Sequence, residues 1–228
     1  MDFGKAFTFV FDDEEWLKKI ALAAVISLIP IVGSLVVMGW GLEVTKRVIR
    51  KDLEELPGWE DFGGYLLSGF MVLVIGFVFF LPMILVQACG SGGLALLGNT
   101  AEQEAAMTAV GIVTACLSCL AILYSIAASL VVPAAIGRYA ATGELGAAFK
   151  FGAVIKMVRE NLGAYFMVFL GVIVSSLVAS LGTILCVIGV LFTTAYSMAI
   201  NGHLVGQAYN VADGSGAAVP AEPIPAAD

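Results

Sequence analysis

The polar residues whose types and spacing could support chemistry are few, and they lie at the ends of long apolar blocks. Glu43 precedes Lys46 by three residues and Arg47 by four, so all three lie on one face of a helix. Opposite charges at this spacing are typical of an interfacial ion pair, which is the interpretation we favour. The alternative is a polar lining at the mouth of a pathway.

A second polar group lies at the end of the last apolar block. His203 is the only histidine, and it shares a helical face with Asn201 and Gln207. An internal alignment described below puts His203 near Arg47 and Arg138, which would allow a ring of three polar side chains. We favour ordinary helix-end residues at the level of the lipid headgroups, because helix C-termini stabilise such groups. A lone histidine is a poor metal site, since zinc usually needs three or four protein ligands.

The sequence carries no recognisable catalytic constellation. It has no Gly-x-Ser-x-Gly elbow, P-loop, dinucleotide-binding fingerprint or His-Glu-x-x-His motif. Cys116 and Cys119 are three residues apart on one predicted helix, and we interpret them as buried packing residues rather than as a metal or redox pair. We therefore predict no catalytic residues, no metal, no cofactor and no enzymatic activity.

The elements that position these residues follow from composition. The chain has 228 residues, of which 60% are hydrophobic and only 13% are charged, and its mean hydropathy is +0.99. Apolar blocks such as Tyr65–Val86 and Met107–Ile136 are long enough for a helix to cross a hydrocarbon core of about 30 Å. We predict an all-α, polytopic transmembrane bundle whose main partner is the bilayer. The net charge of −7 argues against a nucleic-acid partner.

The number of helices depends on two breaks. The block Leu162–Tyr209 is too long for one span, and residues 180–183 predict a tight turn within it. The block Trp16–Arg50 contains Pro30, which kinks or breaks a helix. A single kinked span would give five spans in all. A hairpin would give six helices in three hairpins, with the first arm, Trp16–Ile29, short or re-entrant.

The positions of the basic residues favour the hairpin. With a reversal at Pro30, all eleven lysines and arginines lie on one side of the bilayer, and the positive-inside rule places that side and both termini in the cytoplasm. A single span would place the first of the three basic clusters on the outer side of the membrane. The clusters are Lys5, Lys18 and Lys19; Lys46, Arg47, Arg50 and Lys51; and Arg138, Lys150, Lys156 and Arg159.

The hairpins also suggest an internal repeat within one domain, residues 1–211, with units 1–51, 52–141 and 142–211. Each unit begins with a partly amphipathic segment that we expect to lie at the interface: Phe3–Phe11, Leu56–Phe62 and Leu145–Met157. The tail, 212–228, is rich in Ala and Pro and is predicted to be disordered.

Several segments carry a family resemblance. They are Leu28–Gly33, the basic helix end Val44–Arg50, the Leu-Pro-Gly-Trp-Glu-Asp-Phe-Gly run Leu56–Gly63, and, less specifically, Phe7–Ile20 and Gly202–Gln207. Together they resemble the prokaryotic membrane proteins known as domain of unknown function 4013, over nearly the whole chain up to the tail. The resemblance implies an integral membrane protein without an assigned activity, so it transfers no functional residues.

Within the Leu56–Gly63 run, Trp59 and Asp61 have a physical interpretation of their own. A proline at the start and aromatic residues after it predict a short interfacial helix whose Trp and Phe side chains enter the headgroup layer.

Two functions remain open from the sequence. The first is a structural or organising protein of the cell membrane that acts through homo-oligomers or other membrane proteins. The alternative is a small transporter or permease component for a neutral or amphiphilic solute. The apolar centres contain almost no ionisable groups, which argues against a proton-coupled pump or an ion channel with a charged filter.

Overall fold

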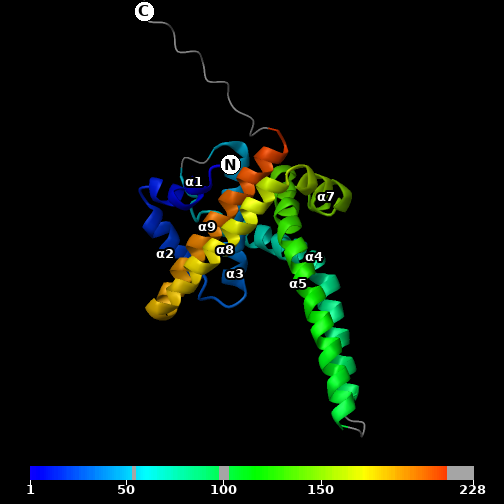
Figure 1. Cartoon of the computed structure of the whole chain (residues 1–228). Coiled ribbons are helices and arrows are strands. Elements are labelled where there is room, and N and C mark those ends of the chain that lie inside the picture. The colour runs from blue at the N-terminus through cyan, green and yellow to red at the C-terminus, as the bar shows by residue number, and fades with distance from the viewer. Residues whose placement is uncertain (53–54, 98–102, 215–228) are drawn as a thin grey trace, which may run out of the picture.

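The structure, a computed structural model, describes residues 1–52, 55–97 and 103–214, and over these residues the chain is helical throughout and contains no strand. The predicted disordered tail therefore lies almost wholly outside the described residues. Figure 1 shows the arrangement. In chain order the elements are α1 (Phe3–Thr8), η1 (Phe9–Asp12), α2 (Trp16–Ile26), α3 (Val32–Arg50), α4 (Phe62–Leu97), α5 (Gln103–Thr142), α6 (Leu145–Ala148), α7 (Phe151–Glu160), α8 (Leu162–Leu181), η2 (Gly182–Leu185) and α9 (Cys186–Ala212).

Pro30 separates two helices and does not kink a single one. α2 ends at Ile26 and α3 begins at Val32, and Ile31 between them has a positive φ of 64°. The helices meet closely at the turn, because a Cβ on Gly33 would lie 1.9 Å from the carbonyl oxygen of Ile26. α2 has only 11 residues, which span about 16 Å at helical rise. It is shorter than the predicted first arm.

Three stretches within the described residues are long and apolar enough to cross a bilayer. They are Phe62–Ala88 in α4, Gly111–Thr142 in α5 and Leu162–Ile184, which continues α8 into η2. The predicted break after α8 is present, since η2 turns the chain from α8 into α9. These findings are compatible with a helical membrane protein and support three candidate spans within the described residues. The predicted count of six helices that enter the membrane stays a prediction.

α3 is the centre of the body of the molecule, packed between the first half of α4 and α9. Its contacts are unusually close because glycines face neighbouring backbones. A Cβ on Gly39 would lie 1.8 Å from the carbonyl oxygen of Tyr65 in α4, and one on Gly202 in α9 would lie 2.3 Å from that of Gly41. Small residues at such crossings let membrane helices approach closely and gain dispersion contacts.

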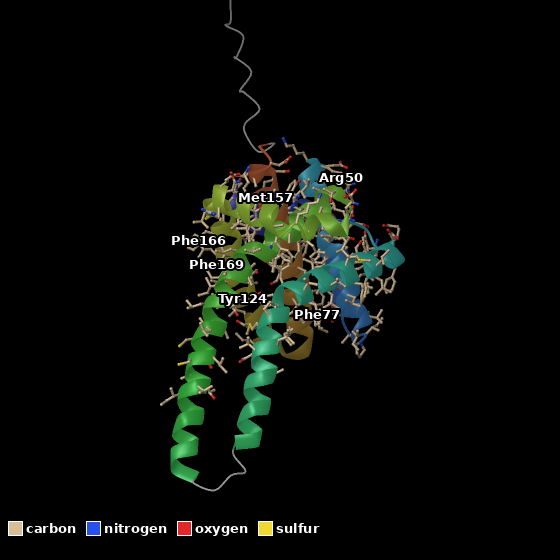
Figure 2. All side chains as sticks on the ribbon, turned by 90° about the vertical axis from the view of Figure 1, so that its right-hand side faces the viewer. Arg50, Phe77, Tyr124, Met157, Phe166 and Phe169 are labelled. Carbon is tan, nitrogen blue, oxygen red and sulfur yellow. The ribbon has the colours of Figure 1, made fainter. Side chains whose placement is uncertain are left out.

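The α4–α5 hairpin leaves this body and projects well beyond it (Figure 1). Figure 2 shows that the first part of α4 runs across the body and turns near Phe77 to run beside α5. Pro82 lies inside α4 and removes a backbone hydrogen bond just after this point, which accounts for the bend. Near the bend, the Tyr124 hydroxyl of α5 donates to the Phe79 carbonyl of α4 and joins the two arms.

Candidate functional site

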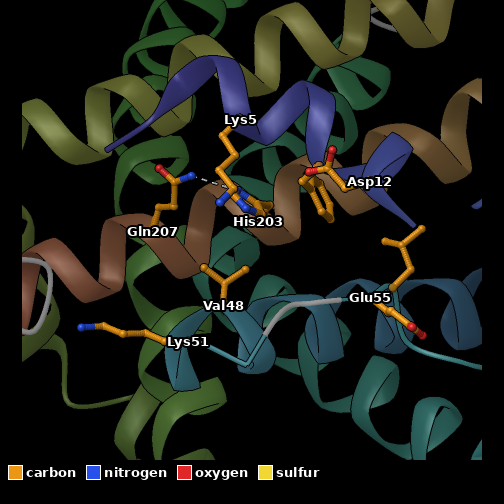
Figure 3. Close-up of a pocket in the computed structure, with 9 residues that line it drawn as sticks. Lys5, Asp12, Val48, Lys51, Glu55, His203 and Gln207 are labelled. Carbon is orange, nitrogen blue, oxygen red and sulfur yellow. Dashed lines mark hydrogen bonds between the residues drawn. The ribbon is translucent and has the colours of Figure 1, made fainter. Parts of the chain in front are cut away.

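A polar cavity of about 330 Å³ opens at the end of the body where the N-terminus lies. Figure 3 shows it between the first helical segment, the end of α3 and α9. The walls therefore come from three segments that are far apart in sequence, residues 5–12, 48–56 and 203–207. The lining residues are Lys5, Phe9, Asp12, Val48, Lys51, Glu55, Leu56, His203 and Gln207.

His203 forms one wall of the cavity, and its ring is almost fully enclosed. It is 4% exposed and stacks on Phe9, with ring centroids 4.4 Å apart. Its Nδ1 lies 3.0 Å from Gln207 Nε2. Since an amide nitrogen can only donate, we infer that Nδ1 accepts and that the ring proton is on Nε2.

His203 lies beyond the apolar part of α9, and its surroundings determine its protonation state. Burial, together with the Lys5 ammonium and against the opposing effect of Asp2, lowers the pKa of His203 to about 4. The imidazole is therefore neutral at pH 7 and offers a hydrogen bond rather than a charge.

Gln207 attaches the N-terminus to α9. Its Oε1 accepts from the Asp2 amide at 2.8 Å, and its Nε2 donates to the Asp2 carbonyl at 3.0 Å. The Asp2 side chain in turn caps α1 by accepting from the Lys5 amide at 2.9 Å. The position of Lys5 in the cavity thus depends on a contact between the two ends of the chain.

Beside the cavity lies a buried ion pair that the sequence did not single out. Asp13 Oδ2 and Lys19 Nζ are 2.7 Å apart, with side chains 3% and 10% exposed. The same carboxylate oxygen accepts from the Leu56 amide at 2.8 Å, and Lys19 Nζ donates to the Leu56 carbonyl at 2.9 Å. Both charges are therefore paired and hydrogen-bonded, which is what burial demands of them.

The environment of Asp13 also fixes its charge. Burial raises the pKa of Asp13, but the hydrogen bond from Lys19, those from the Glu15 and Leu56 amides and the Lys19 charge outweigh it, so the net pKa is lowered. The group remains a carboxylate at neutral pH. A signal was present in the sequence, since an acidic run precedes two lysines, but nothing in it distinguished Asp13 from its acidic neighbours.

The segment after Leu56 is not the interfacial helix that the sequence predicted. Residues 56–61 are extended or bent, and α4 begins only at Phe62. In this segment three consecutive carbonyls accept hydrogen bonds from side chains of other segments, which hold the backbone in its irregular path. The donors are Lys19 Nζ to Leu56 at 2.9 Å, Trp40 Nε1 to Pro57 at 2.9 Å and Tyr65 Oη to Gly58 at 2.8 Å.

Trp59 is half-buried and packs one ring face against the protein. Its ring stacks on Trp40 with centroids 5.5 Å apart and an interplanar angle of 9°. Its Nε1 donates to the Lys19 carbonyl at 3.0 Å. Asp61 caps α4, accepting from the Gly64 amide at 2.9 Å. We call residues 55–61, held by these contacts, the clip segment.

The other predicted polar positions have separate partners. Glu43 lies 2.9 Å from Arg50, 3.4 Å from Lys46 and 3.9 Å from Arg47. Arg47 also donates to the Glu55 carbonyl at 3.2 Å. The cluster is therefore local to the end of α3.

Arg138 and Asn201 lie apart from the cavity. Arg138 Nε donates to the Ala147 carbonyl at 3.1 Å and fixes α6 to α5. Asn201 Oδ1 accepts from Ser175 Oγ of α8 at 2.9 Å, so it faces α8 rather than His203. The structure thus brings His203 and Gln207 together, while Arg47, Arg138 and His203 each contact different groups.

The expectation of buried cysteines on α5 was wrong. Cys116 and Cys119 are both exposed on the surface of this helix as free thiols. Among the described residues, no group of three or more metal-binding side chains occurs. The cavity is instead suited to a small polar molecule, since it offers both signs of charge and a neutral imidazole beside the apolar groups of Phe9, Val48 and Leu56.

Within the described residues, three helices are apolar and long enough to span a bilayer, which is compatible with a helical membrane protein. Residues 22–188 match the family described as Protein of unknown function (DUF4013), and the chain belongs to that family. The match is narrower than the predicted resemblance, because both Phe7–Ile20 and Gly202–Gln207 lie outside it. Neither the curated proteins nor the solved structures include a match to the chain.

Proposed function

We propose that this chain is a non-enzymatic protein of the cell membrane that organises other membrane proteins, either its own copies or unlike partners, through the α4–α5 hairpin. The observation that carries the proposal is the exposure of that hairpin. Only 6% of the residues in the most apolar stretch of α5 are buried within the chain. The side chains of Leu120, Ile122 and Leu123 are 61%, 60% and 65% exposed.

The length of the hairpin supports a role beyond crossing the bilayer. α4 has 36 residues and α5 has 40, which correspond to about 54 Å and 60 Å of helix. About 20 residues per arm are enough to cross a hydrocarbon core of about 30 Å. The first half of α4 packs against α3, and the parts of both arms beyond the bend add contact surface that the body of the molecule does not use.

The topology that we propose has six helices in three hairpins, with α2 re-entrant because of its length and both termini in the cytoplasm. Support comes from the one-sided basic residues and from the arrangement of the reversals. In Figure 1 the turn between α2 and α3, η2 and the far ends of α4 and α5 all point away from the N-terminus.

The organising role can be tested with the thiols on α5. A short bis-maleimide added to native membranes should link Cys116 or Cys119 to a neighbouring chain and give a band of higher mass. The matched variant Cys116→Ser/Cys119→Ser, which keeps Cys89 and Cys186, should lose that band. Exclusively monomeric protein in the membrane and in mild detergent, with no cross-linked partner, would contradict the proposal.

A second candidate, a carrier for a neutral or amphiphilic solute, draws support from the polar cavity between the first and last parts of the chain. Glu43 and Asn201, which such a pathway would need, are engaged with Arg50 and Ser175 instead. Labelling of a Val48→Cys variant distinguishes the carrier from the organising protein. Modification by an impermeant thiol reagent from both sides of the membrane would favour the carrier, and modification from one side would favour the organising role.

A further inference from the structure

We propose that α7 binds the headgroup of an anionic phospholipid on the membrane face where the termini lie. α6 and α7 connect the candidate span in α5, which ends at Thr142, to the one that begins at Leu162. The 19 residues between these two ends must therefore lie at the surface of the bilayer. Figure 2 places Met157 of α7 at the same end of the molecule as Arg50, away from Phe77 and Tyr124.

The inner face of α7 is already occupied by the protein. Val154 and Val158 are 0% and 5% exposed and belong to the core that α5, α8 and α9 form. Phe151 packs its ring against Phe79 of α4, with centroids 5.2 Å apart. The helix is thus fixed in one orientation, and its other face is available to the surroundings.

That outer face combines apolar and basic groups in the way that lipid-binding helices do. Ile155 is 45% exposed. Together with Gly152, Lys156, Arg159 and Glu160 it lines a hollow of about 420 Å³. Gly152 leaves space in this hollow, because a Cβ there would have no atom within 4 Å.

The charges of the hollow favour an anion. Within the described part of the chain Arg159 forms no ion pair, and Lys156 has only a long contact of 3.8 Å with Glu160, in which both side chains are more than 60% exposed. Such an exposed pair contributes little. Lys150 adds a further exposed cation at the start of the helix. A phosphate held by Lys156 and Arg159, with Ile155 against the lipid's apolar part, satisfies each of these groups.

The proposal can be tested on the full-length protein by native mass spectrometry. Phosphatidylglycerol and phosphatidylcholine are titrated separately into the detergent-solubilised protein, and the lipid-bound fractions are compared. Lys156→Gln/Arg159→Gln should weaken phosphatidylglycerol binding about 25-fold, because each basic side chain contributes about fivefold at an anionic surface. Binding of phosphatidylcholine should be unchanged.

The matched control is Lys18→Gln/Arg50→Gln, which removes the same two residue types from exposed positions elsewhere. It should leave phosphatidylglycerol binding within about twofold of the unaltered chain. Equal losses in the two double variants, or no loss in the α7 variant, would overturn the proposal. Displacement of the lipid by inorganic phosphate alone at millimolar concentration would also overturn it, since that would make the hollow a site for free phosphate. The test requires lipid binding but no organising role, so it can fail independently of the proposed function.

Discussion

The body of the molecule and the projecting hairpin are both helical, but they bury their side chains very differently. In α3, Val36, Trp40 and Val44 are fully buried. In the most apolar stretch of α5, only 6% of the residues are buried. α8 of the body and α5 of the hairpin are both apolar enough to span a bilayer, so hydropathy alone does not show how much of a helix is packed against protein. The difference lies in glycines at the crossings and in polar groups that join one segment to another.

The buried ion pair should be the most sensitive point of the body. Lys19→Met leaves Asp13 buried without its partner, and breaking a buried pair in this way costs about 3–5 kcal/mol. Thermal or denaturant unfolding in detergent measures the loss. Asp13→Asn/Lys19→Met removes both charges and should recover part of it. A single variant as stable as the original chain would show that the pair is not important for the body.

A smaller but still large effect is expected at the crossing of α3 and α4. Gly39→Ala places a methyl group 1.8 Å from the Tyr65 carbonyl oxygen, so the helices must separate, at a cost of about 2–3 kcal/mol. Gly111→Ala on α5 is the matched control, since its added Cβ meets nothing within 4 Å. It should be neutral or stabilise by up to about 1 kcal/mol through helix propensity. Similar unfolding temperatures for the two variants would remove the distinction between the regions.

The stability of the body should also depend on pH, because the body contains the buried Asp13. The folded-state pKa of Asp13 is lowered from 3.8, so its contribution is fully present above about pH 4 and is lost as the pH falls through the folded value. The stability difference between the unaltered chain and Asp13→Asn should therefore shrink below pH 4. Unfolding at pH 6, 4 and 3 checks this. A difference that stays constant with pH would show that Asp13 does not titrate as its contacts require.

The smallest effect on stability is expected on the hairpin. Leu123 is 65% exposed, so Leu123→Ala should change the free energy of unfolding by less than about 0.5 kcal/mol. The same change should reduce cross-linking through Cys116 and Cys119 if a partner covers this face. A loss of stability as large as that of Gly39→Ala would mean that α5 is packed against the body after all.

Part of the candidate site could be predicted from the sequence. His203 and Gln207 are four residues apart on one helix, so their contact follows from helical geometry. Asn201 was grouped with them but turns toward Ser175, because the position of α8 decides which way that face points. The proline and aromatic residues of the clip segment predict a helix, which the structure does not contain there. The conformation of the segment depends on donors from Lys19, Trp40 and Tyr65, which no local pattern reveals.

The sequence by itself determined the helical class, the family, the break at Pro30 and the turn after α8, because apolar block length and proline act locally along the chain. Only the tertiary structure decided which blocks form a packed body and which project from it. It also decided that Asp13, rather than its acidic neighbours, is buried with Lys19 against Leu56. Both outcomes depend on backbones that approach each other from separate segments of the chain, and the free energy of such contacts depends on distances that composition and periodicity do not encode.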